Sequence, residues 1–168
     1  MKTLYVLRHA KSDWDDPALR DFDRPLNERG RNAAKAIGRE LHKRGIEPDL
    51  VLSSPALRAK QTIDGVQEGF GQDFDPIEIP RIYNAEPETL IDLVRSTPSG
   101  AKRLMIVGHN PGLQELVLAL SENGELRDEA AQKYPTGTLA EIHFDAREWP
   151  DVALGTGRLV TLLKPRDL

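Results

Sequence analysis

Short apolar runs alternate with helix-forming segments along the chain, and this alternation constrains the fold more than any other feature of the sequence. The runs are rich in Leu, Ile and Val, and most are followed by a turn and a segment with helical periodicity. They lie at residues 3–7, 50–53, 77–79, 104–107, 139–144 and 158–163. Buried strands that alternate with helices are typical of α/β proteins, because parallel neighbours need a helical crossover. We therefore expect a single α/β domain over residues 1–168, a three-layer sandwich with helices on both faces of a mostly parallel sheet.

Local signals mark where the helices begin and end. Asn27 is a good N-cap for a helix that ends before Gly45, because glycine readily adopts the left-handed conformation that terminates helices. Ser54 followed by Pro55 predicts the start of a second helix toward Phe70. Two further helices are expected at residues 87–95 and 110–120, and residues 11–25 are expected to form a polar loop.

Composition excludes several classes of function. The chain has 168 residues, of which 39% are hydrophobic and 30% charged, and its net charge is -4. Proteins that bind nucleic acids or anionic membranes usually carry a positive excess, so we expect neither kind of partner. The chain has no cysteine, which excludes disulfides, thiolate catalysis and cysteine-ligated zinc. No apolar stretch is long enough for a membrane span or a signal peptide, so a cytoplasmic location is expected.

Basic and imidazole side chains follow three of the predicted strands. Arg8 and His9 come directly after the first strand, Arg58 follows the second, and His109 follows the fourth. In open α/β sheets, ligands bind at the edge formed by the carboxyl ends of the parallel strands. We therefore expect these four residues, which are distant in sequence, to meet in one pocket.

This set of side chains suits a phosphoryl group, which carries ~2 negative charges in a monoester or phosphoramidate. Arginine binds phosphate oxygens through two N–H groups, and Arg8, Arg58 and a protonated His109 would offset the charge. His9 would attack phosphorus as a neutral imidazole whose other nitrogen donates a hydrogen bond to a backbone carbonyl. A single histidine after a strand is most often structural, so the prediction rests on the convergence of three signals at one sheet edge.

Four blocks of the sequence resemble a known family. Residues 7–12, Leu-Arg-His-Ala-Lys-Ser, resemble an Arg-His-Gly signature, with Ala10 in the place of the glycine. The other blocks are residues 25–30, 53–62 and 108–111. Together, and in this order, they resemble the histidine phosphatase superfamily, which also contains the cofactor-dependent phosphoglycerate mutases. The short length and residues 83–85 and 135–140 resemble its compact SixA-type phosphohistidine phosphatase branch.

The resemblance implies roles for the four pocket residues. It implies that His9 is the nucleophile that becomes phosphorylated, and that Arg8, Arg58 and His109 complete the phosphate pocket. It implies neither a metal ion nor a cofactor.

Further candidate residues border the same pocket. Lys11 is expected to add positive charge at its mouth, and Ser12 matches a serine of the family pattern, so both are candidate substrate-binding residues. The segment that carries the general acid in mutase-like members is missing, and Glu86 and Glu88 lie in roughly that region. Glu86 is the candidate acid, although it also suits the start of a helix.

The sequence thus predicts a phosphatase that works through a phosphohistidine intermediate. Imidazole is a better leaving group than an alkoxide, so the weak candidate acid favours a phosphohistidine on a protein as substrate. Two alternatives remain open: a phosphatase of small phosphate esters, and a phosphoryl-binding module without catalysis. The sequence identifies neither the physiological substrate nor the oligomeric state.

Overall fold

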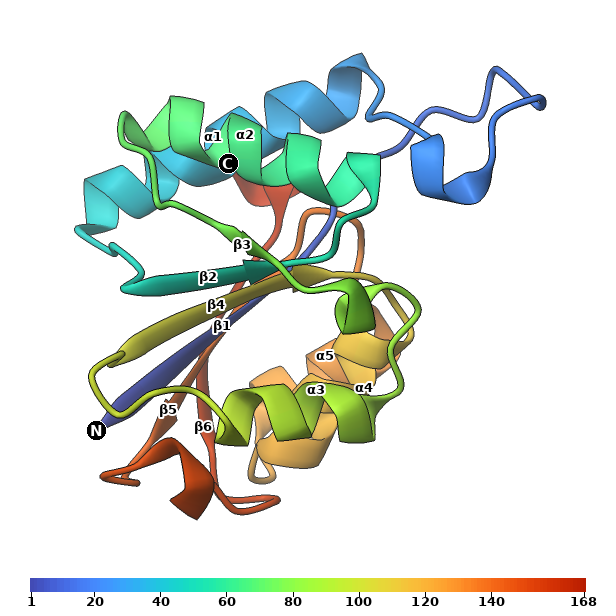
Figure 1. Ribbon diagram of the computed structural model, residues 1–168. Helices are drawn as coiled ribbons and strands as arrows, with labels where there is room; N and C mark the ends of the chain where they lie inside the picture. Colours follow the sequence, from blue (N-terminus) through green and yellow to red (C-terminus); the bar gives the residue numbers. More distant parts are fainter.

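A six-stranded sheet forms the centre of the molecule, for which a computed structural model describes all 168 residues (Figure 1). Its strands are β1 (Lys2–Arg8), β2 (Leu50–Ser53), β3 (Ile77–Glu78), β4 (Arg103–Gly108), β5 (Leu139–Phe144) and β6 (Arg158–Leu163). The strand order is β3-β2-β4-β1-β5-β6. The first four strands in this order run parallel, and β5 and β6 are antiparallel additions at one edge. The predicted α/β class and mostly parallel sheet are confirmed.

Helices cover both faces of this sheet, which gives the three expected layers (Figure 1). They are α1 (Glu28–Arg44), α2 (Leu57–Phe70), α3 (Pro87–Arg95), α4 (Gly112–Leu120) and α5 (Glu125–Gln132). The pair α1 and α2 lies on one face, and α3, α4 and α5 lie on the other (Figure 1). None of these helices is long and apolar enough to cross a membrane.

The core is divided by the sheet into two apolar clusters. Leu4 and Val6 of β1 belong to the cluster under α3 and α4, whereas Tyr5 and Leu7 belong to the cluster under α1 and α2. Successive side chains of a strand point to opposite faces, so a strand covered on both faces must be apolar at nearly every position. This explains why the central strands are recognisable as continuous apolar runs.

The helices α2, α4 and α5 depart from the sequence prediction, and α4 differs only in beginning at Gly112 rather than at residue 110. The α2 helix begins at Leu57, because the Ser54 hydroxyl lies 2.7 Å from Nε2 of His109 and accepts a hydrogen bond from the N–H of Ala56 instead of capping a helix at Pro55. The α5 helix was not expected. Its sequence is largely polar and it buries only Ala130, so it lacks the apolar stripe by which a helix is recognised. The predicted caps of α1 are confirmed: Asn27 accepts a hydrogen bond from Gly30, and Gly45 is left-handed.

The helices α1 and α2 approach each other closely because glycines line their contact. A Cβ atom at Gly38 would lie 2.1 Å from the carbonyl oxygen of Val66, and one at Gly69 would lie 2.1 Å from that of Lys35. Both contacts are with backbone, which cannot move aside as a flexible side chain can. This close contact holds α2, and with it Arg58, in place against the sheet.

We predict that Gly38→Ala lowers the free energy of unfolding by about 3 kcal/mol, because an added methyl forces the two helices apart. Gly100→Ala is the matched control, since a Cβ there meets no atom within 4 Å, and it should change stability by less than about 0.5 kcal/mol. Urea unfolding of the two variants and the wild type measures the difference. Equal stability of the two variants would contradict the proposed packing.

Candidate active site

The carboxyl ends of β1 and β4 bring two histidines side by side. Arg8 is in register with Gly108, and the N–H of His9 donates to the carbonyl of Gly108 at 3.0 Å. The next residue on each strand is a histidine, and the imidazole centroids of His9 and His109 are 5.3 Å apart. Each histidine is only 7% exposed. The predicted convergence at this sheet edge is therefore present in the structure.

The tautomer of His9 is set by a backbone carbonyl. Its Nδ1 lies 2.7 Å from the carbonyl oxygen of Ala10, which can only accept, so Nδ1 carries the proton and Nε2 has a free lone pair. The loop is held in turn by the N–H of Ala10, which donates to Oγ1 of Thr62 in α2. Ala10 has no positive φ, so the alanine in the place of the signature glycine introduces no backbone strain.

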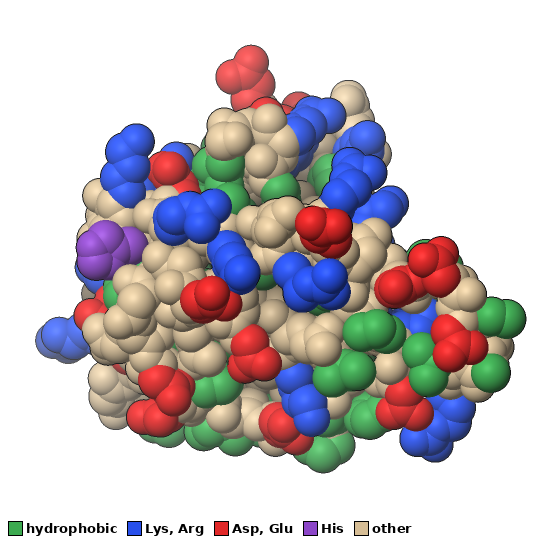
Figure 2. Space-filling view, turned by 90° about the horizontal axis from the view of Figure 1, so that it is seen from above, with side chains coloured by type: hydrophobic (Ala, Val, Ile, Leu, Met, Phe, Trp, Pro, Cys, Tyr) green, Lys and Arg blue, Asp and Glu red, His purple; other side chains and the backbone are tan.

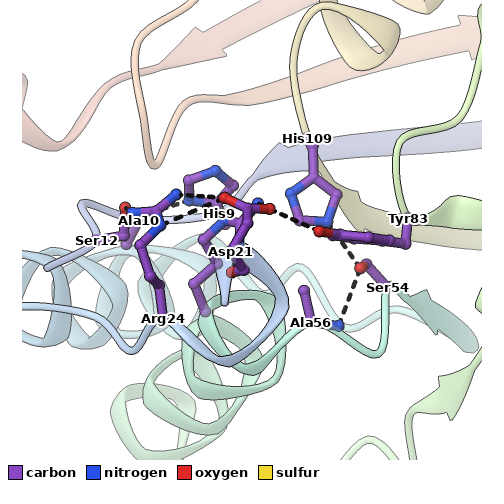
Figure 3. A network of polar contacts seen from close by, with 10 residues as sticks. His9, Ala10, Ser12, Asp21, Arg24, Ser54, Ala56, Tyr83 and His109 are labelled. Atoms are coloured by element: carbon purple, nitrogen blue, oxygen red, sulfur yellow. Dashed lines mark hydrogen bonds and ion pairs between the residues drawn. The ribbon is translucent and has the colours of Figure 1, made fainter. Parts of the chain in front are cut away.

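His109 is held between Ser54 and Tyr83. Its Nε2 lies 2.7 Å from the Ser54 hydroxyl, and the Tyr83 ring stands edge-on to it with centroids 5.5 Å apart (Figure 3). Its Nδ1 is buried and has no hydrogen-bond partner. Since the Ser54 oxygen already accepts from Ala56, its hydroxyl proton can be donated to Nε2, which leaves the proton of His109 on Nδ1.

Two arginines complete the group, Arg58 buried and Arg8 half-buried. Arg8 donates from Nη1 to the carbonyl of Tyr134 at 2.9 Å. Arg58, in the first turn of α2, donates from Nη1 to the backbone carbonyl of Asp21 at 2.6 Å and from Nη2 to its carboxylate at 3.0 Å. The Nε atoms of both arginines are buried without a partner. The four residues predicted to form one pocket thus share one sheet edge and retain unused polar atoms there.

Burial sets the charge state of both histidines. Burial, together with the positive charge of Arg58, lowers the pKa of His9 to about 4 and that of His109 to about 3. Both imidazoles are therefore neutral at pH 7 when no phosphoryl group is bound, and a protonated His109 beside a phosphoryl group stays a prediction. A bound phosphoryl dianion would raise the pKa of the histidines, because a nearby negative charge favours the protonated ring.

A polar cluster that the sequence did not reveal borders the histidines. Asp21 accepts hydrogen bonds from Tyr83 at 2.7 Å, from Arg58, and from Arg24 at 3.0 Å (Figure 3). Partial burial alone would raise the pKa of Asp21, but these three donors hold it well below its usual range. The Arg24 guanidinium also stacks 3.4 Å from the ring centroid of Trp14. Only long-range folding brings these residues together, so an Asp-rich loop was all that the sequence indicated.

The remaining predicted residues occupy different positions. Ser12 is buried, and its hydroxyl accepts a hydrogen bond from Arg24. Lys11 is exposed and lines a cavity beside α1. Glu86 is the exposed N-cap residue of α3 and lines a hollow of about 150 Å³ together with His109, whereas Glu88 does not line it. No group of three or more His, Asp or Glu side chains is placed to share a metal ion.

Comparison with known proteins agrees with this geometry. Residues 4–82 match the model of the histidine phosphatase superfamily, branch 1. A solved structure from Agrobacterium tumefaciens, described as a candidate phosphohistidine phosphatase SixA, is 34% identical, with a TM-score of 0.84 over 98% of both chains. An uncharacterized protein of Mycobacterium tuberculosis is 32% identical over 95% of this chain and 100% of its own length. The phosphohistidine phosphatase SixA of Escherichia coli is 24% identical over 84% of this chain and 85% of its own.

The chain therefore belongs to the histidine phosphatase superfamily and, within it, to the SixA-type branch. Proteins of this class are phosphatases that use a histidine nucleophile, and the chain is an enzyme of this kind.

The buried histidines should make the folded state sensitive to acid. In the unfolded chain a histidine binds a proton below a pKa of ~6.5, whereas His9 and His109 in the folded chain have pKa values of about 4 and about 3. Between these values the unfolded state binds more protons, so stability falls as the pH is lowered from 6.5 toward 4. The slope is about 1.4 kcal/mol per pH unit for each histidine.

Urea unfolding at pH 6.5 and pH 4.5 tests this prediction. Wild type should lose about 2–3 kcal/mol more stability between the two pH values than His109→Asn, because the variant lacks one of the two groups. The carboxyl groups that also titrate in this range are common to both proteins and cancel in the comparison. An identical loss in the two proteins would show that folding does not lower the pKa of His109.

Proposed function

We propose that this enzyme removes the phosphoryl group from phosphohistidine on a protein, with His9 as the nucleophile. The substrate assignment rests on the size of the hollow beside His109. Its volume of about 150 Å³ is well below the ~300–1,000 Å³ typical of sites that enclose a small molecule. Neither His9 nor Arg8 nor Arg58 lines the hollow, so it would take the ring that bears the phosphoryl group, while the phosphoryl group lies against His9 and the rest of the substrate stays outside. The likeness to the SixA phosphatase of Escherichia coli supports the same substrate class.

Three buried polar atoms without partners support phosphoryl binding. They are Nε of Arg8, Nε of Arg58 and Nδ1 of His109. A buried donor without a partner costs about 1–3 kcal/mol, so such atoms are rare unless a ligand satisfies them. Phosphoryl oxygens would accept hydrogen bonds from these groups. The positive charge of the two arginines would stabilise the charge that spreads over these oxygens in the transition state.

In the first step, Nε2 of His9 attacks phosphorus with its lone pair. The P–N bond of the substrate breaks, and its electron pair returns to the substrate imidazole. When that ring carries a proton on its other nitrogen, it departs as neutral imidazole and needs no proton from the enzyme. Donor and acceptor are the same chemical group, so the transfer is close to balanced in free energy. His9 then carries the phosphoryl group on Nε2 while Nδ1–H remains bonded to the Ala10 carbonyl.

In the second step, water attacks phosphorus and the bond between phosphorus and Nε2 breaks. The electron pair returns to Nε2, which regenerates neutral His9. Both protons of the water leave with the product as dihydrogen phosphate, which then equilibrates with solvent. Burial favours this release, because the low pKa of His9, about 4, makes the free ring stable as the neutral form.

We predict that His9→Ala lowers phosphate release from a phosphohistidine-bearing protein by at least about 10³-fold, because the nucleophile is lost. His42→Ala, which removes an exposed histidine at the end of α1, is the matched control and should retain full activity. A continuous assay of released phosphate at neutral pH measures both rates. Residual activity of His9→Ala close to that of the wild type would assign the attack to another group.

The substrate assignment is tested by comparing the phosphoprotein with p-nitrophenyl phosphate. A preference for the phosphoprotein, with Glu86→Gln unchanged on it, supports the proposal. A preference for the ester that Glu86→Gln abolishes would favour the alternative, a small-ester phosphatase with Glu86 as its acid, since Glu86 lines the same hollow as His109. If the protein binds phosphate but releases none from either substrate, the result would favour a module that binds phosphoryl groups without catalysis.

Asp21 occupies part of the position that a phosphoryl group would take on Arg58. Its carboxylate accepts from Nη2 of Arg58 at 3.0 Å, and its side chain is 48% exposed. A phosphoryl dianion that binds both arginines would compete with this carboxylate and be repelled by it. Asp21 therefore acts as an internal competitor that the substrate displaces.

We predict that Asp21→Asn binds tungstate about two- to fivefold more tightly than wild type, the effect expected of one half-exposed ion pair. Asp23→Asn, two residues away and paired with Arg20 rather than Arg58, should bind as the wild type does. Isothermal titration calorimetry measures the three affinities. Weaker tungstate binding by Asp21→Asn would instead show that Asp21 is needed to hold Arg58 in position.

A further inference from the structure

A second cavity, of about 610 Å³, lies beside the loop that carries His9 but contains neither catalytic histidine. It is formed by the first half of α1, the segment before β5 and the segment after β6. Its basic lining residues are Lys11, Arg29, Lys133, Lys164 and Arg166, and no acidic side chain lines it. On the face seen from above in Figure 2, Lys and Arg side chains are interspersed with Asp and Glu side chains. In a chain with 27 acidic and 23 basic residues, such a lining is a strong local departure from the average.

Most of these charges are not neutralised by the protein. Lys11, Arg29 and Lys133 have no carboxylate within 4.0 Å, and the carboxylate nearest to Arg166 is that of Asp167 at 3.8 Å. Lys164 alone has a close partner, Glu129, at 2.8 Å. Cations that surround one concave volume repel each other, and the repulsion is relieved when an anion binds between them.

Helix stability does not explain the charge at this end of α1. Arg29 lies in the first turn, where the helix dipole favours acidic residues and disfavours basic ones. The dipole and Arg29 therefore add to the same positive potential in the cavity.

The walls of the cavity are held in fixed positions. A Cβ at Gly30 would lie 2.1 Å from the Lys11 carbonyl oxygen, so α1 packs directly on that backbone. A Cβ at Gly137 would lie 2.7 Å from the Pro165 ring, and the N–H of Gly137 donates to the carbonyl of His9 at 2.9 Å. The cavity is thus preformed and shares a wall with the catalytic loop.

We propose that this cavity binds a compact polyanionic small molecule, such as one carrying two or more phosphate groups. Its volume lies within the range of small-molecule sites. No aromatic residue lines it, so a nucleobase or other ring would find no stacking partner, and the ligand is compact and rich in anionic groups. This site is separate from the phosphoryl pocket, and the proposal does not depend on the substrate of that pocket.

Inorganic triphosphate is a suitable probe, used with the Arg58→Ala protein so that binding to the phosphoryl pocket is weakened. Isothermal titration calorimetry should detect one triphosphate per chain, with an affinity that falls as salt is raised. Lys133→Ala and Arg29→Ala, each added to this background, should weaken binding about tenfold, as expected for the loss of one charge-assisted hydrogen bond. Lys133→Arg should retain binding.

Lys43→Ala is the matched control, because it removes one exposed charge from the opposite end of α1. It should change the affinity by less than about twofold. Equal weakening by Lys43→Ala and Lys133→Ala would mean only general attraction to positive charge, and would overturn the proposal. So would the absence of triphosphate binding in the Arg58→Ala background. A thermal melt of each variant confirms that it is folded.

Discussion

The active site depends on the in-register pairing of β1 with β4. Their last pair joins Arg8 to Gly108, so His9 and His109 leave the sheet at the same level and from adjacent strands. Both strands are buried on both faces, and a shift by one residue would turn every side chain to the wrong face. Gly108 adds a second constraint, because a Cβ there would lie 2.9 Å from Ile82, the residue before Tyr83. The same pairing therefore sets the nucleophile, the second histidine and the tyrosine beside it.

Burial then gives these groups their chemical properties. Withdrawal from water keeps both histidines neutral, because burial lowers the pKa of His9 by more than the Ala10 hydrogen bond raises it. It also lowers the pKa of His109 by more than the negative charge of Asp21 raises it. It also strengthens the field of Arg8 and Arg58, since charges interact more strongly where water is excluded. The site gathers hydrogen-bond donors and cations, and the Asp21 carboxylate offsets only part of their positive charge.

Much of the fold could be predicted, because its signals are local. The bounds of α3, β5 and β6 match the prediction residue for residue, since each has a clear apolar pattern and flanking turn residues. The α5 helix could not be predicted, because its polar sequence carries no such pattern. The strand order was equally inaccessible, because which strands become neighbours depends on how helices cover the sheet. The cluster of Asp21, Arg24 and Tyr83 was also missed, because the sequence alone does not show that these loop residues meet in the fold.

The sequence by itself determined which residues end the parallel strands, and therefore that His9, Arg58 and His109 lie at one edge of a sheet. That conclusion follows from strand periodicity and from the rule that parallel strands carry their ligand site at their carboxyl ends. Only the tertiary structure decided the charge state of His109, the partner of Arg58 and the basic lining of the second cavity. These properties depend on burial and on contacts between residues far apart in the chain, and neither is encoded in any local pattern.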